Sequence, residues 1–411
     1  MSNFEQRLDQ YADLLIRVGI NLQPGQKLIV RGSLEHADLV RRAVAKAYEA
    51  GAGRVFVDWT DPQVRRMTAE RATEDGLKEY PPSWLKWQEE LLAGGGALLS
   101  VTGSDPQLLA GIEPGRVSAM LQAAARVNQG VSALTATMQA SWCVGAAPVQ
   151  GWANAALPDL PESERVAALW DRVFTACRID GVTDPVPAWR VHLGRLGERT
   201  DFLNRMQFTR LHYRAPGTEL TVGLPANHLW FSGAGSRNSQ GVPFCPNLPT
   251  EEVFTAPQRD AVDGVVRSTL PLNHGGALIT GLTLRFERGR VVEYSADSGV
   301  EVLKGILETD EGARFLGEVA LVPVSSPINQ TGILFYNTLF DENASCHLAV
   351  GRAYPFCVQG GTAMSAAERE QAGLNFSNTH VDFVIGSAEL DIDGETASGE
   401  RVPLFRRGMW V

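Results

Sequence analysis

Apolar residues in the first 200 positions follow two alternating spacings. Short apolar runs of strand length are separated by segments in which apolar residues recur every three or four positions, as on one face of a helix. Strands separated by helices predict parallel βαβ units, so this half is expected to form an α/β domain whose sheet is covered on both faces. The predicted strands are 26–33, 54–61, 97–105 and 141–149, with helical segments at 36–51, 81–96 and 164–179.

The pattern changes after the Pro-punctuated stretch 180–189, which one further helix follows. Alternating apolar and polar residues then indicate antiparallel hairpins, with a helical segment at 299–316. The sequence therefore predicts the fold class α/β, with an N-terminal α/β domain and a mainly parallel sheet at 1–200, followed by a β-rich α+β domain at 201–411. The predicted hairpins are 208–225, 282–297 and 389–405.

One predicted strand, 378–387, contains a histidine and an aspartate among apolar residues. Because side chains alternate faces along a strand, Val381 and Phe383 share one face. His380 and Asp382 share the other face, where an imidazole and a carboxylate two residues apart suit two ligands of one metal centre. Taken alone, the same pair also fits a half-buried histidine that is hydrogen-bonded to a neighbouring carboxylate.

A second predicted strand, 344–354, also carries a histidine. Alternation places His347 on one face with Ser345 and Ala349, and these small neighbours leave room for a bulky group such as a metal cluster. Cys346 points to the opposite, apolar face, so we expect a core thiol and not a ligand.

Glutamates stand on or beside other strands of the same half. Glu251 and Glu252 lie in an extended segment between two prolines, and Glu318 opens an apolar strand at 318–324. Separately, each has a plain alternative as a solvated carboxylate. Together with the two histidines they form a mixed nitrogen and oxygen set that suits Zn²⁺, Co²⁺ or Mn²⁺. Three or more carboxylates carry more negative charge than one zinc ion requires, so two metal ions balance the set better.

Composition and charge exclude several other functions. Of 411 residues, 44% are hydrophobic and 20% charged, as in soluble globular proteins, and no apolar run approaches the ~18 residues of a membrane span. The net charge of −10 and the lack of a basic cluster disfavour a nucleic-acid partner. Five cysteines without a C-x-x-C pair argue against a disulfide framework or a zinc finger. The amphipathic, acidic N-terminal segment is unlike a signal peptide, which predicts a cytoplasmic protein.

Two glycine-rich segments, 51–53 and 94–96, precede predicted strands, whereas the glycines of a dinucleotide-binding fingerprint follow one. We interpret them as helix C-caps and tight turns. The chain has no G-x-x-x-x-G-K-[ST] motif and no G-x-S-x-G between a strand and a helix, so it shows no serine-hydrolase nucleophile.

The glutamates and histidines lie in four motifs that follow one another along the chain: P-T-E-E-V-F-T-A-P at 249–257, E-V-A-L-V-P at 318–323, H-L-A-x-G-x-A-Y at 347–354 and N-x-S-x-x-H-V-D-F at 375–383. These motifs resemble those of the thermophilic aminopeptidase family, a family of dinuclear metallo-aminopeptidases. The resemblance covers essentially the whole chain and implies a homodimer with the active site inside a cavity. The choice of Glu252 over Glu251 as a ligand rests on this resemblance. The implied metal ligands are Glu252, Glu318, His347, His380 and Asp382, and the implied active-site tyrosine is Tyr354.

The expected reaction is metal-assisted hydrolysis of the N-terminal peptide bond of peptides with a free N-terminus, with two divalent ions (Zn²⁺, Co²⁺ or Mn²⁺) per chain. Five ligands for two ions imply that one carboxylate bridges, and the sequence leaves open which one. Glu251 is the candidate general base. Tyr354 stands seven residues after His347 at the end of the same strand, nominally on the other face; a bulge near Gly351 could return its phenol to the site as a donor to the oxyanion.

Two other functions stay open. One is a metallo-amidase that acts on another amide. The other is a non-catalytic α/β protein in which these residues form a structural metal site or plain polar networks. Closed structural zinc sites favour cysteine-rich tetrahedra, which this set of residues does not contain.

Overall fold

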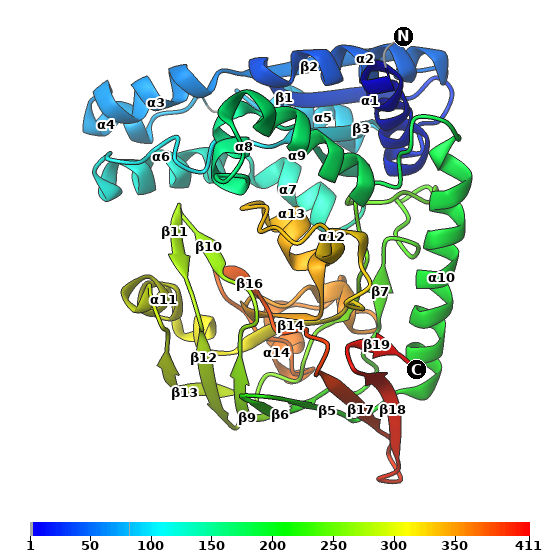
Figure 1. Cartoon of the computed structure of the whole chain (residues 1–411), viewed down its shortest axis with the longest axis vertical. Coiled ribbons are helices and arrows are strands. Elements are labelled where there is room, and N and C mark those ends of the chain that lie inside the picture. The colour runs from blue at the N-terminus through cyan, green and yellow to red at the C-terminus, as the bar shows by residue number, and fades with distance from the viewer. Residues whose placement is uncertain (1–2, 82) are drawn as a thin grey trace. The chain divides into compact units, whose positions relative to one another are not determined.

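A computed structural model describes residues 3–81 and 83–411 of the chain (Figure 1). These residues form two compact units, and helix α10 (Pro185–Met206) spans the point where the chain first passes from one to the other. Among the described residues, no helix is long and apolar enough to cross a membrane. The first unit comprises residues up to 192 together with 233–249, and the second comprises 193–232 and 250–411.

The predicted boundary at residue 200 would place segment 233–249 in the second domain, but the segment packs within the first unit. The backbone N–H of Val144 donates to the carbonyl oxygen of Pro246 at 2.7 Å, and the N–H of Leu248 donates to the carbonyl oxygen of Val144 at 3.0 Å. The segment therefore continues the hydrogen bonding of the last strand of the first sheet.

The first unit is built on a four-stranded parallel sheet with the strand order β2-β1-β3-β4. All four strands lie within the predicted ranges, so the parallel βαβ prediction is confirmed. Because β1 lies between β2 and β3, the chain first adds a strand on one side of β1 and then crosses to the other side. The strands are β1 (Lys27–Ser33), β2 (Arg54–Thr60), β3 (Ala97–Thr102) and β4 (Ser141–Ala146).

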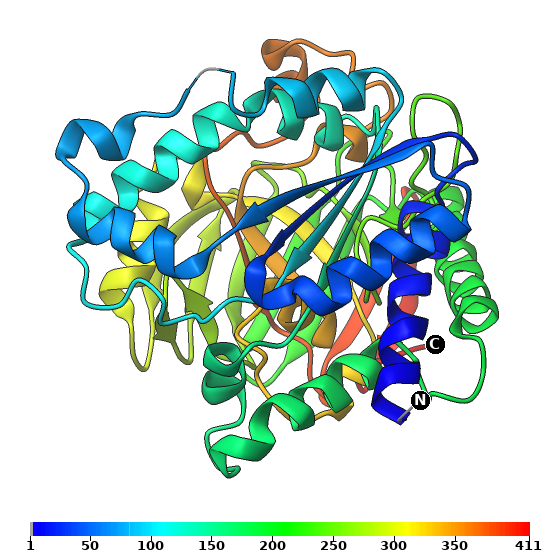
Figure 2. The same ribbon diagram turned by 90° about the horizontal axis from the view of Figure 1, so that it is seen from above.

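Helices pack on both faces of this sheet, as predicted. Ile29 of β1 packs in one buried cluster with Leu92 of α5 (Lys86–Ala93) and Val131 of α7 (Gln129–Ala136). The opposite side of β1 faces α2 (Ala37–Glu49), where Val40 lies so close that a Cβ added to Gly32 would meet it at 2.9 Å. Figure 2 shows these strands, in blue and cyan, running side by side.

Several helices of the first unit have no clear signal in the sequence. Helix α3, for example, buries only Ala69, so its residues show no apolar face. The predicted helix at 81–96 is shorter, because α5 begins at Lys86, and Pro82 lies outside the described residues. Gly94 caps α5, which confirms the interpretation of that glycine-rich segment. The other helices are α1 (Asn3–Leu14), α3 (Pro62–Arg71), α4 (Glu74–Lys78), α6 (Pro114–Val127), α8 (Gln150–Ala156) and α9 (Glu162–Ala176).

The second unit is β-rich, and every strand pair described in it is antiparallel. Its larger sheet contains all three predicted hairpins, and its strand order is β13-β12-β9-β6-β5-β17-β18-β19. These strands are β5 (Arg210–Ala215), β6 (Thr218–Gly223), β9 (Val262–Arg267), β12 (Thr283–Glu287), β13 (Arg290–Ser295), β17 (Asp391–Glu395), β18 (Arg401–Arg406) and β19 (Met409–Trp410).

A five-stranded sheet with the order β16-β15-β14-β8-β7 carries both histidine strands. One face of it contributes Val319, Leu348 and Phe383 to the main hydrophobic core of the unit. Cys346 lies in the same core, and burial raises the pKa of its thiol to about 12, so the predicted core thiol is confirmed. The strands are β7 (Phe231–Ser232), β8 (Val253–Thr255), β14 (Leu316–Leu321), β15 (His347–Gly351) and β16 (His380–Val384).

Short elements complete the second unit. A two-stranded ribbon pairs β10 with β11, and α11 lies within the predicted helical segment 299–316. These elements are β10 (Leu272–His274), β11 (Ala277–Ile279), α11 (Val300–Leu307), α12 (Pro327–Gln330), α13 (Thr338–Asp341) and α14 (Ala366–Gln371).

Candidate metal centre

Three neighbouring strands bring polar side chains together on the face of the five-stranded sheet opposite the core. In the strand register, Ala349 of β15 lies directly between Glu318 of β14 and Asp382 of β16. Two residues further along β15, Gly351 pairs with His380. Because Ala349 and Gly351 occupy almost no volume above the sheet, larger side chains on both flanking strands can converge over β15. Ala349, one of the two small neighbours predicted beside His347, thus leaves room above the sheet, and Gly351 adds to it.

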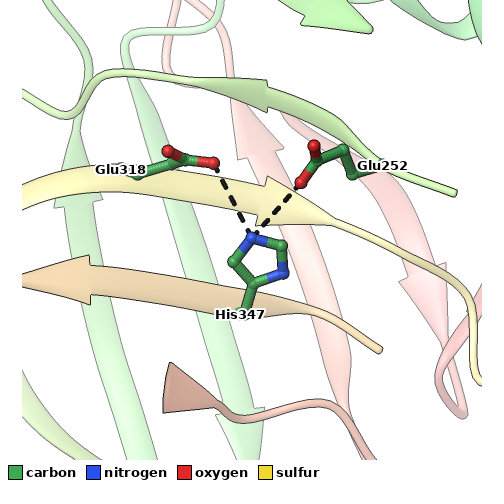
Figure 3. A group of neighbouring side chains, drawn as sticks. All are labelled: Glu252, Glu318 and His347. Atoms are coloured by element: carbon green, nitrogen blue, oxygen red, sulfur yellow. Dashed lines mark ion pairs between the residues drawn. The ribbon is translucent and has the colours of Figure 1, made fainter. Parts of the chain in front are cut away.

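Glu252, Glu318 and His347 form the first cluster of this site (Figure 3). The Nε2 atom of His347 lies 3.4 Å from Oε2 of Glu252 and 3.7 Å from Oε1 of Glu318. All three side chains are buried. Each offers a ligand atom within 4.8 Å of the others, a spacing at which one ion could contact all three.

Glu318, His380 and Asp382 form a second cluster of the same kind. The Nε2 atom of His380 lies 3.3 Å from Oε2 of Glu318 and 3.4 Å from Oδ1 of Asp382. The two carboxylate oxygens of Glu318 therefore face different histidines. Two clusters of three ligands that share one carboxylate make a pattern that could hold two neighbouring ions.

The position of Glu318 differs from the prediction in one respect. Strand β14 begins at Leu316, with an irregular register between Leu316 and Glu318, so the prediction that Glu318 opens its strand was wrong. Glu318 is only 5% exposed, which rules out the solvated strand-end carboxylate considered as its alternative.

Backbone carbonyl groups orient both imidazole rings. Nδ1 of His380 lies 2.7 Å from the carbonyl oxygen of Arg352, and Nδ1 of His347 lies 3.4 Å from that of Ser345. A ring that donates from Nδ1 to a carbonyl keeps its Nε2 lone pair available, which is how metal-ligating histidines are commonly held. In both residues, Nε2 is the atom that faces the carboxylates.

The close packing of these groups shifts their pKa values strongly. Burial raises the pKa of Glu252. Burial also opposes the ionisation of Glu318, but hydrogen bonds with His347 and His380 outweigh it and lower its pKa to about 2. Burial disfavours the charged imidazoles, but the surrounding carboxylates outweigh it and raise both histidine pKa values well above the usual range. Without metal, the site therefore balances its negative charge with protons on the histidines.

Glu342 is a further carboxylate at this site that the sequence reasoning missed. Burial raises its pKa well above the usual range, and the charges of Asp382 and Glu252 raise it further. Its position directly after the short helix α13, outside any strand, gave no periodic signal. The only sequence cue was an acidic residue five positions before His347 in D-E-N-A-S-C-H.

Glu251, the candidate general base, is buried beside the first cluster. Its backbone N–H donates to Oδ1 of Asn343 at 2.7 Å, and Asn343 is fully buried. Among the described residues, the clusters able to hold an ion include Glu252 and not Glu251.

Tyr354 lies beside the second cluster, although it is not part of a strand. Strand β15 ends at Gly351, which has a φ of 106°, so the prediction that the strand continues to Tyr354 was wrong. The chain turns after Gly351 and brings the Tyr354 ring to 5.1 Å from the His380 ring. Burial raises the pKa of Tyr354 well above 10, and the nearby charges of Glu318 and Asp382 raise it further, so its phenol keeps its proton.

The donor set fits divalent metal ions. Two imidazoles and three carboxylates, those of the buried Glu252 and Glu318 and the half-buried Asp382, make up the two clusters, and the half-buried carboxyl group of Glu342 lies near them. Divalent cations would offset the charge that these carboxylates concentrate in one place. Nitrogen and carboxylate oxygen donors without thiolates suit Zn²⁺, Co²⁺ or Mn²⁺.

Comparisons with known proteins agree over the whole chain. The model of the thermophilic metalloprotease (M29) family matches residues 4–410. The chain is 48% identical to aminopeptidase AmpS of Bacillus subtilis and 44% identical to aminopeptidase T of Thermus thermophilus, and each alignment covers 100% of both chains. Its structure is similar to that of wild-type AmpT from Thermus thermophilus, with a TM-score of 0.93 and 43% identity over 99% of this chain and 100% of that one.

Proposed function

This chain belongs to the thermophilic metalloprotease (M29) family and is a metal-dependent aminopeptidase, and we propose that it works with two divalent ions held side by side in the second unit. The observation that carries this proposal is the position of Glu318, whose two oxygens face different histidines. Glu252 and His347 would complete one ion site, and His380 and Asp382 the other. Glu318 would then be the carboxylate shared by both ion sites, the role that the sequence left open.

The bound ions would supply a water of lowered pKa and polarise the scissile carbonyl. Glu251 acts as the general base, because it is buried next to a ligand without being part of either cluster. Tyr354 donates a hydrogen bond from its phenol to the oxyanion that develops on the former carbonyl oxygen. Its raised pKa ensures that the donor proton is present at neutral pH.

The proposed substrates are peptides with a free N-terminus, because the similar proteins are named aminopeptidases. Hydrolysis of amino-acid p-nitroanilides should stop when the amine is acetylated. Equal rates on free and N-acetylated substrates would instead favour an amidase acting on another amide. We further propose that the protein is a homodimer, which light scattering on the purified chain tests.

The number of ions per chain tests the bridging role of Glu318. Wild-type protein should bind about two divalent ions, which elemental analysis measures after gel filtration. Glu318→Gln should lose both, whereas His347→Ala and His380→Ala should each lose mainly one. If Glu318→Gln retained as much metal as either histidine variant, Glu318 would not bridge. One tightly held ion in the wild type, without peptidase activity, would favour a structural metal site.

A further inference from the structure

We propose that Asn343 is a positioning residue of the metal centre, which holds the proposed general base Glu251 in place. This role rests on the proposed function, because Glu251 is the base of the proposed reaction. Asn343 lies in the short 3-10 helix η4 (Glu342–Ala344), between α13 and β15, and its exposed fraction is 0%. Its side chain therefore acts only on buried neighbours, and these include residues of the metal centre.

The oxygen of the Asn343 side chain holds the segment that carries two adjacent glutamates. Oδ1 accepts the backbone N–H of Glu251 at 2.7 Å, at the short end of the usual range. This residue precedes β8, whose described strand pairs begin at Val253, so those pairs do not include its N–H. From the same segment, Glu252 points toward His347 (Figure 3). A shift of the backbone at Glu251 would therefore move the proposed base and a proposed ligand together.

The nitrogen of the same side chain bonds to the segment that precedes β15. Nδ2 of Asn343 donates to the carbonyl oxygen of Leu339 at 3.2 Å, and it lies 3.4 Å from Oε1 of Glu342. Glu342 is the further carboxylate at the metal centre. A carboxamide can accept from a backbone N–H with one end and donate to two oxygens with the other. Asn343 thereby connects the segment of Glu251 to a second carboxylate of the site.

The backbone of Asn343 is itself anchored, so its side chain is a fixed support. Its carbonyl oxygen accepts from the hydroxyl of Ser326 at 2.7 Å, and Ser326 is 1% exposed. The same hydroxyl accepts the N–H of Ile328 at 3.2 Å, at the start of α12. Asn343 thus links the segment of Glu251 to both α12 and α13. Such support matters for rate, because a misplacement of about 1 Å can cost on the order of 10²-fold.

Steady-state kinetics of the full chain on an amino-acid p-nitroanilide, with Co²⁺ in excess, tests this role. Asn343→Ala should lower kcat about 10–100-fold, the usual loss when an outer hydrogen-bond partner of a metal site is removed. KM should change less than about threefold, because the lost contacts are to the base and not to the substrate. In a Glu251→Gln background, Asn343→Ala should lower kcat by less than about threefold more, because a residue that acts through Glu251 has little left to position.

Asn238 provides the matched control, because it is a buried asparagine of the first unit whose side chain is equally engaged. Its Oδ1 accepts the N–H groups of Gln240 at 2.9 Å and Val242 at 3.0 Å, and its Nδ2 donates to the hydroxyl of Ser141 at 3.1 Å. Asn238→Ala should lower the Tm, as Asn343→Ala does, but leave kcat and KM unchanged.

The visible absorption of bound Co²⁺ provides a readout that does not depend on turnover. The bands should shift in Asn343→Ala, because Glu252 adjoins the residue that this substitution releases, and outer contacts orient metal ligands. They should match the wild type in Asn238→Ala. A wild type that binds Co²⁺ without hydrolysing p-nitroanilides would contradict the proposed function, and the bands would then decide the role of Asn343: unchanged bands in Asn343→Ala would overturn it.

A milder variant covers the case in which Asn343→Ala does not fold. Ser326→Ala removes one hydrogen bond to the Asn343 backbone and should lower kcat about threefold at an unchanged KM. In an active wild type, the proposal is overturned if every folded variant of Asn343 and Ser326 keeps the wild-type kcat. It is also overturned if the separate losses from Glu251→Gln and Asn343→Ala multiply in the double variant, because Asn343 would then act independently of Glu251.

Discussion

Neighbouring residues of strand β16 serve separate purposes because their side chains point to opposite faces. His380 is oriented by the carbonyl oxygen of Arg352 and directs Nε2 toward the carboxylates. Val381, the next residue, is 7% exposed and belongs to the hydrophobic core. Substitutions one position apart should therefore affect either metal binding or stability.

We expect His380→Ala and Asp382→Asn to reduce metal content and nearly abolish turnover while the protein stays folded. Val381→Ala should instead cost about 0.5–3 kcal/mol of unfolding free energy, through lost burial and a residual cavity, with metal content intact. Elemental analysis and thermal melts under matched metal conditions measure both effects. Unchanged metal content and activity in both polar variants would contradict the assignment of this strand.

The ring of Tyr354 lies 5.1 Å from the ring of His380, and Tyr354 is in neither ion-holding cluster of the described residues. Its ring stacks on Phe356 with centroids 5.3 Å apart, so Tyr354→Phe should preserve the packing. Removing only the hydroxyl should lower kcat on the order of 10²–10³-fold if it is the oxyanion donor, with both ions retained. Steady-state kinetics with elemental analysis tests this, and Phe356→Leu serves as a packing control. An unchanged kcat would assign Tyr354 to packing alone.

At the level of elements, the start of β16 depends on one aspartate in another segment. Asp310 accepts hydrogen bonds from the hydroxyl of Ser377 and the backbone N–H of Asn378, both at 2.7 Å. It also accepts from the N–H of Ala313 at 3.0 Å. The segment that leads into His380 is thereby held at its start.

Asp310→Ala should lower the free energy of unfolding by about 1–3 kcal/mol, because three donors lose their acceptor. Burial alone would raise the pKa of Asp310, but these hydrogen bonds lower it below its usual value of 3.8. Its contribution is therefore complete above the unfolded pKa and is lost as pH falls through the lower folded value. Denaturant unfolding from pH 7 to pH 2 should show wild type and variant converging at the acid end. The control Asp201→Ala, at an exposed position of α10, should lower the free energy of unfolding by less than about 0.5 kcal/mol at every pH. If the difference in unfolding free energy between wild type and Asp310→Ala were the same at every pH, the hydrogen bonds would not have this role.

Helices and strands with a clear periodic pattern of apolar residues could be predicted from the sequence. Which side chains from different elements come together could not. The alternation in β15 and β16 correctly placed His347, His380 and Asp382 on one face. Glu342 follows a four-residue helix, which is too short to show a periodic pattern, and its place near Asp382 and Glu252 results from tertiary packing. Glu318 lies between the two histidines because the strand register pairs it with Ala349. The sequence pattern of a single strand does not determine its register with its neighbours.

At the scale of the whole molecule, bound cations would offset negative charge that the fold concentrates at the metal centre. The chain carries a formal net charge of −10, and the metal centre concentrates part of it in a buried cluster. Bound cations that interact with the folded state alone stabilise it by mass action. Chelation should therefore abolish hydrolysis and lower the Tm, and added Zn²⁺, Co²⁺ or Mn²⁺ should restore both. Full activity after confirmed removal of metal would contradict a metal-dependent reaction.

The metal-free protein should also respond to pH differently from the metal-loaded protein. The folded pKa values of His347 and His380 lie above the usual 6.5, so their contribution to stability is complete below pH 6.5 and is lost as pH rises through the folded values. The raised pKa values of Glu252 and Glu342 act in the same direction, since these acids ionise more readily in the unfolded chain. The Tm of chelated protein should therefore fall between pH 6 and pH 9, whereas metal-loaded protein, with neutral ligating imidazoles, should lose much less over that range. Thermal melts of both forms at matched pH values test this prediction. The double variant His347→Ala/His380→Ala is the control, because it removes the two titrating groups. If the Tm fell equally with pH in the chelated and metal-loaded proteins, these histidines would not carry the protons.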